Sequence, residues 1–210
     1  MTINAICRGI LAASALVFFS PASQASADGY QPPISVQKEI VAYTVNRDGS
    51  YRMQEERSVR VENEQGIEGF GDANLPYTPG LESLEIEEAY TRLPDGTRIK
   101  VPAANIRTTN DDLSRGGATY SDRKHKVIIF PNVTVGSQLY IKYVKTVHTP
   151  LFPGQFSFIK YTGSMVKYGL LEVEVNYDPA MHIDFHTRGF KGGKLPDRDG
   201  LHRYRAACRP

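Results

Sequence analysis

The chain has 210 residues, of which 40% are hydrophobic and 23% charged, and its formal net charge at pH 7 is +2. This length suits one large domain or two small ones, and the composition excludes an intrinsically disordered chain. Tryptophan is absent, whereas the 12 tyrosines and 9 phenylalanines lie mostly in segments of alternating polarity, which is typical of β-strands.

Residues 1–27 have the pattern of a secretory signal peptide. Arg8 is their only charge, Ile10–Phe19 is a short apolar run, and Ala25-Ser26-Ala27 supplies the small residues that a signal peptidase needs. We expect cleavage before Asp28, export to the periplasm of a Gram-negative bacterium, and no transmembrane segment in the mature chain. A retained membrane anchor is the alternative, but the apolar run is too short to span a bilayer.

Two hairpins are predicted from their turns. A lead-in over residues 28–35 precedes the first, in which Val36–Asn46 and Tyr51–Val61 flank an Asp48-Gly49 turn. The second covers Leu84–Val101 and is closed by a turn containing Pro94, Asp95 and Gly96. A short helix is the alternative on its glutamate-rich side.

Gly96 is expected to need a positive φ. We therefore expect valine to be more costly at Gly96 than at Gly192, which lies in a predicted basic Gly-Gly loop.

Two long loops are predicted at Glu64–Gly80 and Pro102–Tyr120, because both are rich in glycine, proline or Asn-Asp clusters. Loops of this length often carry function. Seven residues in them are therefore candidates for an interaction surface: Gly66, Phe70, Tyr77, Arg107, Asp112, Arg115 and Tyr120.

The remaining segments also alternate in polarity. The predicted strands are Lys126–Phe130, Gln138–Val147, Phe156–Tyr161, Val166–Tyr177, Met181–Thr187 and His202–Ala206. No segment shows a sustained apolar stripe with helical spacing. The sequence therefore predicts an all-β fold, an antiparallel β-sandwich of roughly eight to ten strands with two long loops, in a single domain over residues 36–207.

Charge is divided unevenly along the chain. Residues 28–95 hold 6 basic and 14 acidic side chains, a net of −8, and residues 96–210 hold 18 and 9, a net of +9. A basic half is compatible with nucleic acid, but the predicted export argues against that partner and favours an anionic envelope polymer. The simpler interpretation is that early and late strands interleave and neutralise one another.

His182, Asp184 and His186 form the one cluster that resembles a metal site. On a strand, all three side chains share one face, while Ile183 and Phe185 point to the other. Neighbouring same-face residues are about 6.6 Å apart, so the outer pair cannot share a zinc ion without ligands from elsewhere. A solvated strand face is the favoured interpretation, and no metal or other cofactor is predicted.

Catalytic motifs are not found. The chain contains no Gly-x-Ser-x-Gly elbow and no glycine-rich phosphate loop. After signal cleavage Cys208 is the only thiol, and we expect it to be a bystander near a mobile end, because a nucleophile needs a positioned base. The sequence therefore predicts that this chain is not itself an enzyme.

Several short motifs resemble those of a known family. They are Tyr51 after Asp48-Gly49-Ser50, the run from Leu84 into Leu93-Pro94-Asp95-Gly96, Tyr120-Ser121-Asp122, and Ile129-Phe130-Pro131-Asn132-Val133 followed by Gly136-Ser137 and Tyr140. Over roughly residues 36–190 the chain resembles the domain of unknown function found N-terminal to transglutaminase-like domains in exported bacterial proteins. The resemblance implies a β-sandwich that precedes a papain-like catalytic domain with Cys, His and Asp.

The chain departs from that family pattern because no catalytic domain follows the sandwich and Cys208 matches no catalytic motif. Two functions therefore remain open. The first is a non-catalytic binding module of the cell envelope, whose partner is a transglutaminase-like domain in cis or in trans, another envelope protein, or an anionic polymer. The second is the N-terminal part of a transglutaminase-like or cysteine-protease-like enzyme whose catalytic domain is missing or separately encoded.

Overall fold

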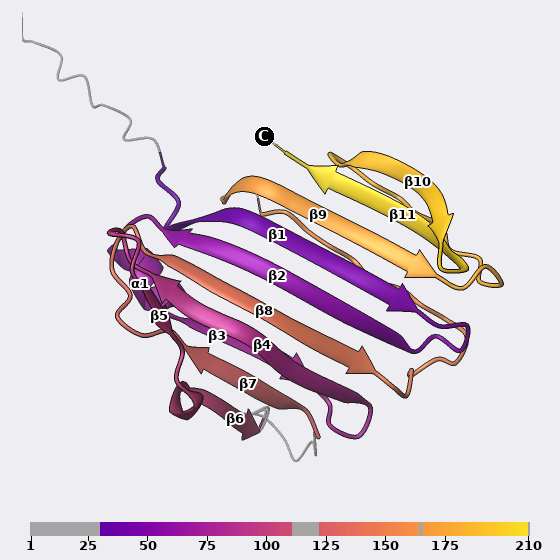
Figure 1. The fold of residues 1–210 in the computed structure, drawn as a ribbon, viewed down its shortest axis with the longest axis horizontal. Helices are drawn as coiled ribbons and strands as arrows, with labels where there is room; N and C mark the ends of the chain where they lie inside the picture. The colour runs from indigo at the N-terminus through magenta and orange to yellow at the C-terminus, as the bar shows by residue number, and fades with distance from the viewer. Residues whose placement is uncertain (1–29, 111–121, 164–165, 210) are drawn as a thin grey trace, which may run out of the picture. The chain divides into compact units, whose positions relative to one another are not determined.

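Two β-sheets make up most of the described chain (Figure 1). The computed structural model describes residues 30–110, 122–163 and 166–209. Within these ranges there are eleven strands, one α-helix and one short 3₁₀ turn: β1 Ile34–Val45, β2 Tyr51–Val61, α1 Glu64–Phe70, β3 Asp72–Tyr77, β4 Glu82–Arg92, β5 Arg98–Lys100, η1 Ala103–Asn105, β6 Ile106–Asn110, β7 Lys124–Ile129, β8 Gln138–Val147, β9 Lys167–Tyr177, β10 Lys191–Arg198 and β11 Leu201–Cys208.

The larger sheet has eight strands in the order β10-β11-β9-β1-β2-β8-β4-β5. Three local hairpins, β1–β2, β4–β5 and β10–β11, are joined by pairings between strands that are distant in sequence. One of these is parallel, because β9 runs alongside β1 in the same direction. All other pairs in the sheet are antiparallel.

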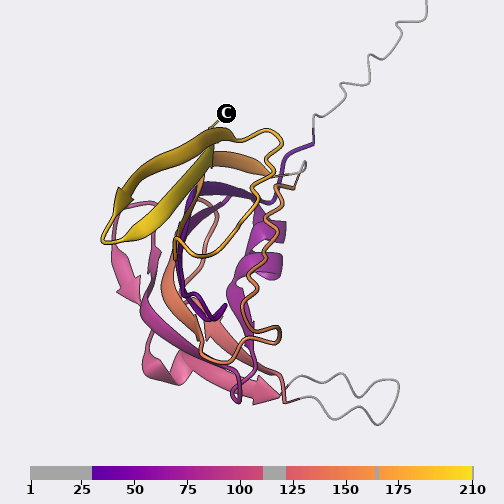
Figure 2. The same cartoon turned by 90° about the vertical axis from the view of Figure 1, so that its right-hand side faces the viewer.

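The smaller sheet has three antiparallel strands in the order β3-β7-β6. Two lysines connect it to the larger sheet through backbone carbonyl groups. Lys126 of β7 donates to the carbonyl of Leu84 at 2.7 Å, and Lys145 of β8 donates to the carbonyl of Pro76 at 2.7 Å. Figure 2 shows the two layers from the side.

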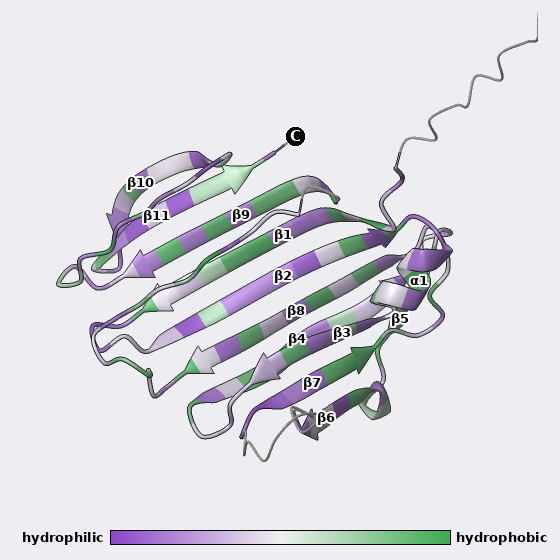
Figure 3. Cartoon of the chain, turned by 180° about the vertical axis from the view of Figure 1, so that it is seen from behind, coloured by the Kyte–Doolittle hydropathy of each residue, from purple (hydrophilic) through white to green (hydrophobic). Residues whose placement is uncertain are grey.

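The main core lies between the two sheets. Alternate residues of β1, β2, β8 and β4 face inward, which gives the banded hydropathy visible along the strands in Figure 3. The buried members of this core are Val41, Met53, Val61, Ala73, Leu75, Leu84, Ala89, Val101, Ile128, Phe130, Leu139, Ile141 and Tyr143.

A second core lies beyond the edge of the small sheet. It contains Val45 of β1 and three residues of β9, namely Val173, Val175 and Tyr177. No strand covers it among the described residues. Two segments outside the sheets, residues 156–162 and 182–190, supply the covering aromatic and aliphatic side chains, and we call them the first and second covering segments. The second bends at Arg188 and Gly189, where Gly189 has a φ of +78°.

The structure confirms the predicted all-β sandwich and both hairpins. It differs from the prediction in having eleven strands among the described residues, rather than roughly eight to ten, and one parallel pair, β1 with β9. Gly49 and Gly96 have φ values of +86° and +89°, as the turns require. Asp95 also accepts a hydrogen bond from the backbone of Thr97 at 2.9 Å, which is the local bond expected of an aspartate in this turn. The glutamate-rich side of the second hairpin is strand β4, not a helix.

The prediction of a loop over residues 64–80 is wrong. Asn63 caps helix α1 by accepting a hydrogen bond from the amide of Gly66 at 3.2 Å, and β3 follows immediately. The glycines and Pro76 suggested a loop, but pairing with β7 outweighs that local preference. The second predicted loop contains η1 and β6, and its residues 111–120 lie outside the described residues.

Two predicted strands are extended but unpaired. Phe156–Tyr161 and Met181–Thr187 show the expected alternation of inward and exposed residues, yet neither belongs to a sheet. Conversely, β10 was predicted as a basic Gly-Gly loop, because its glycines and lysines lack the usual strand preference.

Ion pairs confirm that acidic and basic halves neutralise each other. Because β8 lies between β2 and β4, late lysines meet early glutamates across neighbouring strands. Lys142 Nζ lies 2.8 Å from Glu87 Oε2, and Lys145 Nζ lies 3.7 Å from Glu82 Oε2. Arg98 Nη2 lies 2.6 Å from Glu88 Oε1 in the second hairpin.

The predicted signal peptide lies outside the described residues, whereas the last strand of the chain is described. No helix in the described part of the chain is long and apolar enough to cross a membrane. Cys208 was expected near a mobile end, but it is the half-buried last residue of β11 and faces Leu171 in the register with β9.

The surroundings of the glycines reverse the expected order of the stability losses caused by valine at Gly96 and Gly192. We expect Gly96→Val to lower the free energy of unfolding by about 1–3 kcal/mol, because valine is strained at a φ of +89°. Gly192→Val will be more damaging, since a Cβ there lies 1.9 Å from the carbonyl oxygen of Arg205. Gly193→Val is the control, because its Cβ meets nothing within 4 Å. Urea unfolding measures all three; a Gly96 variant as stable as the Gly193 control would contradict the assignment of the turn.

Candidate binding groove

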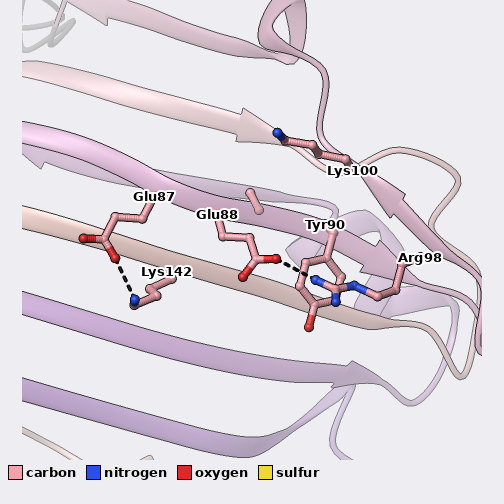
Figure 4. Close-up of a pocket in the computed structure, with 7 residues that line it drawn as sticks. Glu87, Glu88, Tyr90, Arg98, Lys100 and Lys142 are labelled. Atoms are coloured by element: carbon pink, nitrogen blue, oxygen red, sulfur yellow. Dashed lines mark hydrogen bonds and ion pairs between the residues drawn. The ribbon is translucent and has the colours of Figure 1, made fainter.

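One hollow in the described surface, which we call the first, lies on the outer face of the larger sheet (Figure 4). It has a volume of about 490 Å³. Glu87 is paired with Lys142, and Glu88 is paired with Arg98, whose guanidinium lies 3.7 Å from the centroid of the Tyr90 ring. These charged groups already have partners, so they offer little to a ligand.

The stacked tyrosines beside this hollow are also held in place. The rings of Tyr90 and Tyr140 are stacked with centroids 4.6 Å apart. Burial, followed by the charges of Glu56 and Glu88, raises the pKa of Tyr140 to about 12. The phenol therefore stays neutral at physiological pH and contributes no negative charge to the outer face.

The second hollow, of about 300 Å³, contains buried charges that fasten the first covering segment to the sheet. Lys160 of that segment donates a hydrogen bond to the carboxylate of Glu39, a residue of β1 that is buried. Nearby, Tyr143 donates to Glu55 Oε2 at 2.7 Å. Burial and then the charge of Glu55 raise the pKa of the Tyr143 phenol, which keeps it a hydrogen-bond donor. We interpret these groups as structural.

The third hollow, of about 740 Å³, is larger than the other two, and we call it the groove. Its floor is formed by inward-facing residues of β9 and β11, and its two walls are formed by the covering segments. The lining residues are Phe158, Ile159, Lys160, Tyr161, Thr162, Val173, Val175, Asp184, Phe185, His186, Thr187, Arg188, Phe190, Tyr204 and Ala206. This volume is in the usual range for ligand sites.

Aromatic contacts hold the walls against the larger sheet. In the first covering segment, Phe158 stacks on Tyr43 of β1 with a centroid distance of 4.8 Å. In the second, Phe185 stacks on Tyr204 of β11 at 3.9 Å and 2° between the planes. The inward face of each wall is therefore fixed by packing, although neither wall is part of a sheet.

The opposite faces of the walls are open to solvent. Ile159 and Tyr161 of the first covering segment are 73% and 77% exposed, which is unusual for such large apolar side chains when they occur side by side. Arg188 of the second segment is also exposed and makes no hydrogen bond or ion pair with another described residue. The groove thus combines an apolar wall with a positive charge that has no partner in the described part of the chain.

The backbone of the walls is unpaired as well. Between residues 156 and 162, and between 182 and 190, no amide or carbonyl group forms a hydrogen bond with another described residue. Backbone groups require a partner, which here is water or a bound molecule. This arrangement can bind another polypeptide through its main chain as well as through side chains.

Two members of the predicted metal-like cluster, Asp184 and His186, line the groove. His182, Asp184 and His186 are exposed, whereas Ile183 and Phe185 point inward, as the predicted alternation requires. His182 Nε2 lies 3.5 Å from Asp184 Oδ1. Among the described residues no group of three or more His, Cys, Asp and Glu side chains could hold a metal ion.

The predicted interaction residues are not brought together in one described site. Gly66 is buried in α1, and Phe70 lines the second hollow. Tyr77 ends β3, and Arg107 lies on β6. Asp112, Arg115 and Tyr120 lie outside the described residues.

The groove residues were missed because the sequence indicated ordinary strands at Phe156–Tyr161 and Met181–Thr187. One signal was nevertheless available. Ile159 and Tyr161 occupy positions of the first segment that alternation assigns to the solvent face, where large apolar residues are uncommon.

Comparisons with known proteins concern the fold. The model of the family described as a domain of unknown function with a solved structure (DUF3857) matches residues 47–210. A structure from Parabacteroides distasonis described as a putative protease aligns with a TM-score of 0.76 at 17% identity. The alignment covers 84% of this chain and 35% of that one, so the chain spans about a third of that structure.

Other structures align less closely. An M1 zinc metallopeptidase from Deinococcus radiodurans has a TM-score of 0.35 at 14% identity, covering 85% of this chain and 40% of that one. Native yeast LTA4 hydrolase has a TM-score of 0.37 at 10% identity, covering 84% and 29%. No curated protein matches the chain in sequence.

A charged cluster behind the groove floor leads to a prediction about pH. Burial alone would raise the pKa of Glu174, but the hydrogen bond from Arg203 and the charges of Arg203 and Arg205 outweigh it and lower that pKa below its ordinary 4.5. Arg203 Nη2 lies 2.8 Å from Glu174 Oε1. The stability from this pair is present above the ordinary value and is lost as the pH falls through the lower folded-state pKa.

We therefore expect Glu174→Gln to lower the free energy of unfolding by about 1–2 kcal/mol at pH 7. The difference from wild type should shrink as the pH falls below 4.5. Glu85→Gln, at an exposed position on β4, is the control. Chemical unfolding at a series of pH values measures both variants, and a Glu174 effect that is constant down to pH 3 would contradict the explanation.

Proposed function

Because this chain belongs to the DUF3857 family of domains of unknown function, we propose that it is a non-catalytic interaction module that binds a polypeptide partner in the groove. The observation that carries this proposal is that two features occur together in the walls of the groove. Ile159 and Tyr161 are exposed, and the backbone groups of both walls form no hydrogen bond with another described residue. Large exposed apolar residues in a hollow of this size mark binding surfaces.

The partner we propose is a transglutaminase-like catalytic domain, in cis or in trans, in the periplasm. The sequence resemblance implies such a neighbour. The similarity to a third of a structure described as a putative protease supports an accessory role beside a catalytic domain. An anionic envelope polymer is a weaker candidate, because it matches the charge of Arg188 but not the apolar wall.

The proposal assigns no catalytic role to Cys208. A thiol nucleophile needs a base held against it and a second group that orients the base. Cys208 instead faces Leu171 across the β9–β11 ladder. The second candidate function is that of a non-catalytic part of a protease-like or transglutaminase-like enzyme, which the Parabacteroides similarity favours. In that case the catalytic groups are supplied by another domain, and the role of the groove is unchanged.

We expect the purified mature protein, from Asp28 onward, to capture a protein with a transglutaminase-like domain from periplasmic extract, identified by mass spectrometry. The double variant Ile159→Ser with Tyr161→Ser should reduce this capture at least tenfold. Val135→Ser is the matched control, because Val135 is an exposed apolar residue that does not line the groove.

Equal capture by the groove variant and the control would contradict the proposal, and so would capture of no transglutaminase-like protein. Thiol-dependent casein hydrolysis by the purified chain, abolished by Cys208→Ser, would show that the chain is itself catalytic.

A further inference from the structure

We propose that the partner enters the groove as an extended β-strand inserted between the two covering segments and hydrogen-bonded to both. This inference rests on the proposed function and specifies how the groove recognises its polypeptide. Strand addition of this kind takes its affinity from main-chain hydrogen bonds and its specificity from alternate side chains.

Over residues 156–161 and 182–186 the covering segments show the alternating burial of strands, but they belong to no sheet among the described residues. Along the first, Phe156, Phe158 and Lys160 are partly buried while the residues between them are exposed. Along the second, Ile183 and Phe185 alternate with exposed neighbours in the same way. A strand-like conformation with period two normally lies beside another strand, so the described structure lacks one or more strands at this place.

The spacing of the walls suits one inserted strand. Phe158 places the first segment over β1. Phe185 places the second over Tyr204 of β11, with the ring of Tyr177, the last residue of β9, 5.8 Å away. In the sheet order β11-β9-β1, these two strands are separated by β9 alone. Two strand spacings amount to roughly 9–10 Å, which is the separation of two strands that share one neighbour. The inserted strand would therefore lie over β9.

The direction of the walls allows the same strand to pair with both. The first segment leads back to Lys167 at the start of β9, and the second leads from Tyr177, at the end of β9, to Lys191 at the start of β10. Lys191 lies beside Ala207, which in turn pairs with Glu172, the central residue of β9, so the second segment runs from the end of β9 back to the level of its middle. Both segments thus run antiparallel to β9 and parallel to each other (Figures 1 and 2).

The side chains of the groove indicate the composition of the strand. Val173 and Ala206 on the floor favour small aliphatic residues on its inward face. On the other face, the exposed carboxylate of Asp184 lies 3.5 Å from His182 Nε2. Arg188, exposed on the same wall, has no ion-pair partner among the described residues and favours a carboxylate. The occupant we propose is therefore an extended segment of another polypeptide in which aliphatic and acidic residues alternate.

A helix fits these observations less well. Its backbone groups are satisfied internally, so it would leave those of both walls without protein partners. An anionic polymer lacks the aliphatic side chains that the floor requires.

The test uses four blocked heptapeptides and the mature protein, with binding measured by NMR titration. The first alternates valine and glutamate, and the second alternates valine and lysine. The third and fourth are the valine–glutamate peptide N-methylated either on every valine or on every glutamate. Because successive amides of a strand point to opposite edges, each methylated peptide loses its donors toward one wall.

We expect the valine–glutamate peptide to bind and to shift the amide signals of both covering segments. Each methylated peptide should bind at least tenfold more weakly, and so should the valine–lysine peptide. Arg188→Glu should reverse the preference for glutamate over lysine, whereas Lys100→Glu, on the outer face, should leave it unchanged.

Several results would overturn the inference: no binding of the valine–glutamate peptide, an undiminished affinity of either methylated peptide, or signal shifts confined to one wall. If partner capture still depends on Ile159 and Tyr161 in that case, the proposed function stands and only the mode of recognition is wrong. If the peptides behave as expected while no transglutaminase-like protein is captured, the strand site stands and the proposed partner is wrong.

Discussion

The inner face of the eight-stranded sheet is apolar, and it must be shielded from water along its whole width. Burial of such a face is the main favourable contribution to folding, so an uncovered strip would expose the second core. The three-stranded sheet covers β2, β8 and β4, and it does so with strands that satisfy one another's backbone groups. Over β1, β9 and β11 the cover consists of side chains from two unpaired segments. The requirement for burial is met there, while the requirement for backbone hydrogen bonding is left to water or to a partner.

This division separates a structural half from a half that we propose to bind the partner, and we call the second the binding half. In the structural half, buried polar groups such as Glu55 and Tyr143 are bonded to one another, and lysines tie the two sheets through backbone carbonyls. In the binding half, Lys160 and the stacked Phe158 and Phe185 hold the segments on the sheet but leave their outward faces free. On the outer face, Glu87 and Glu88 are paired with Lys142 and Arg98, so these four charged groups offer little to a ligand.

The sequence predicted correctly those elements whose structure depends on residues close together in the chain. The turns at Gly49 and Gly96 need residues of a particular conformation, and alternation then fixes the flanking strands. It failed for β3 and β10, whose proline and glycines have poor strand preference and which form because a distant or adjacent strand pairs with them. The parallel pairing of β1 with β9 could not be predicted either, because nothing local distinguishes it from an antiparallel one.

The groove shows the same limit of prediction from sequence, namely that pairing between distant segments is not encoded locally. Alternation at Phe156–Tyr161 and Met181–Thr187 correctly predicted which side chains face inward, since that depends on extended conformation alone. It could not predict the absence of a neighbouring strand. The candidate loop residues were chosen for loop length, which proved a poor guide because helix α1 and strand β3 occupy most of the first loop.

Hydrogen exchange of the free mature protein tests most directly whether the covering segments lack strand partners. Exchange depends on opening of protected amides, so unpaired backbone exchanges rapidly even where its side chains are buried. We predict that amides of residues 156–162 and 182–190 exchange at least a hundredfold faster than those of β1 and β9. Protection of these segments equal to that of β9 would show that they already have partners, and would contradict the account.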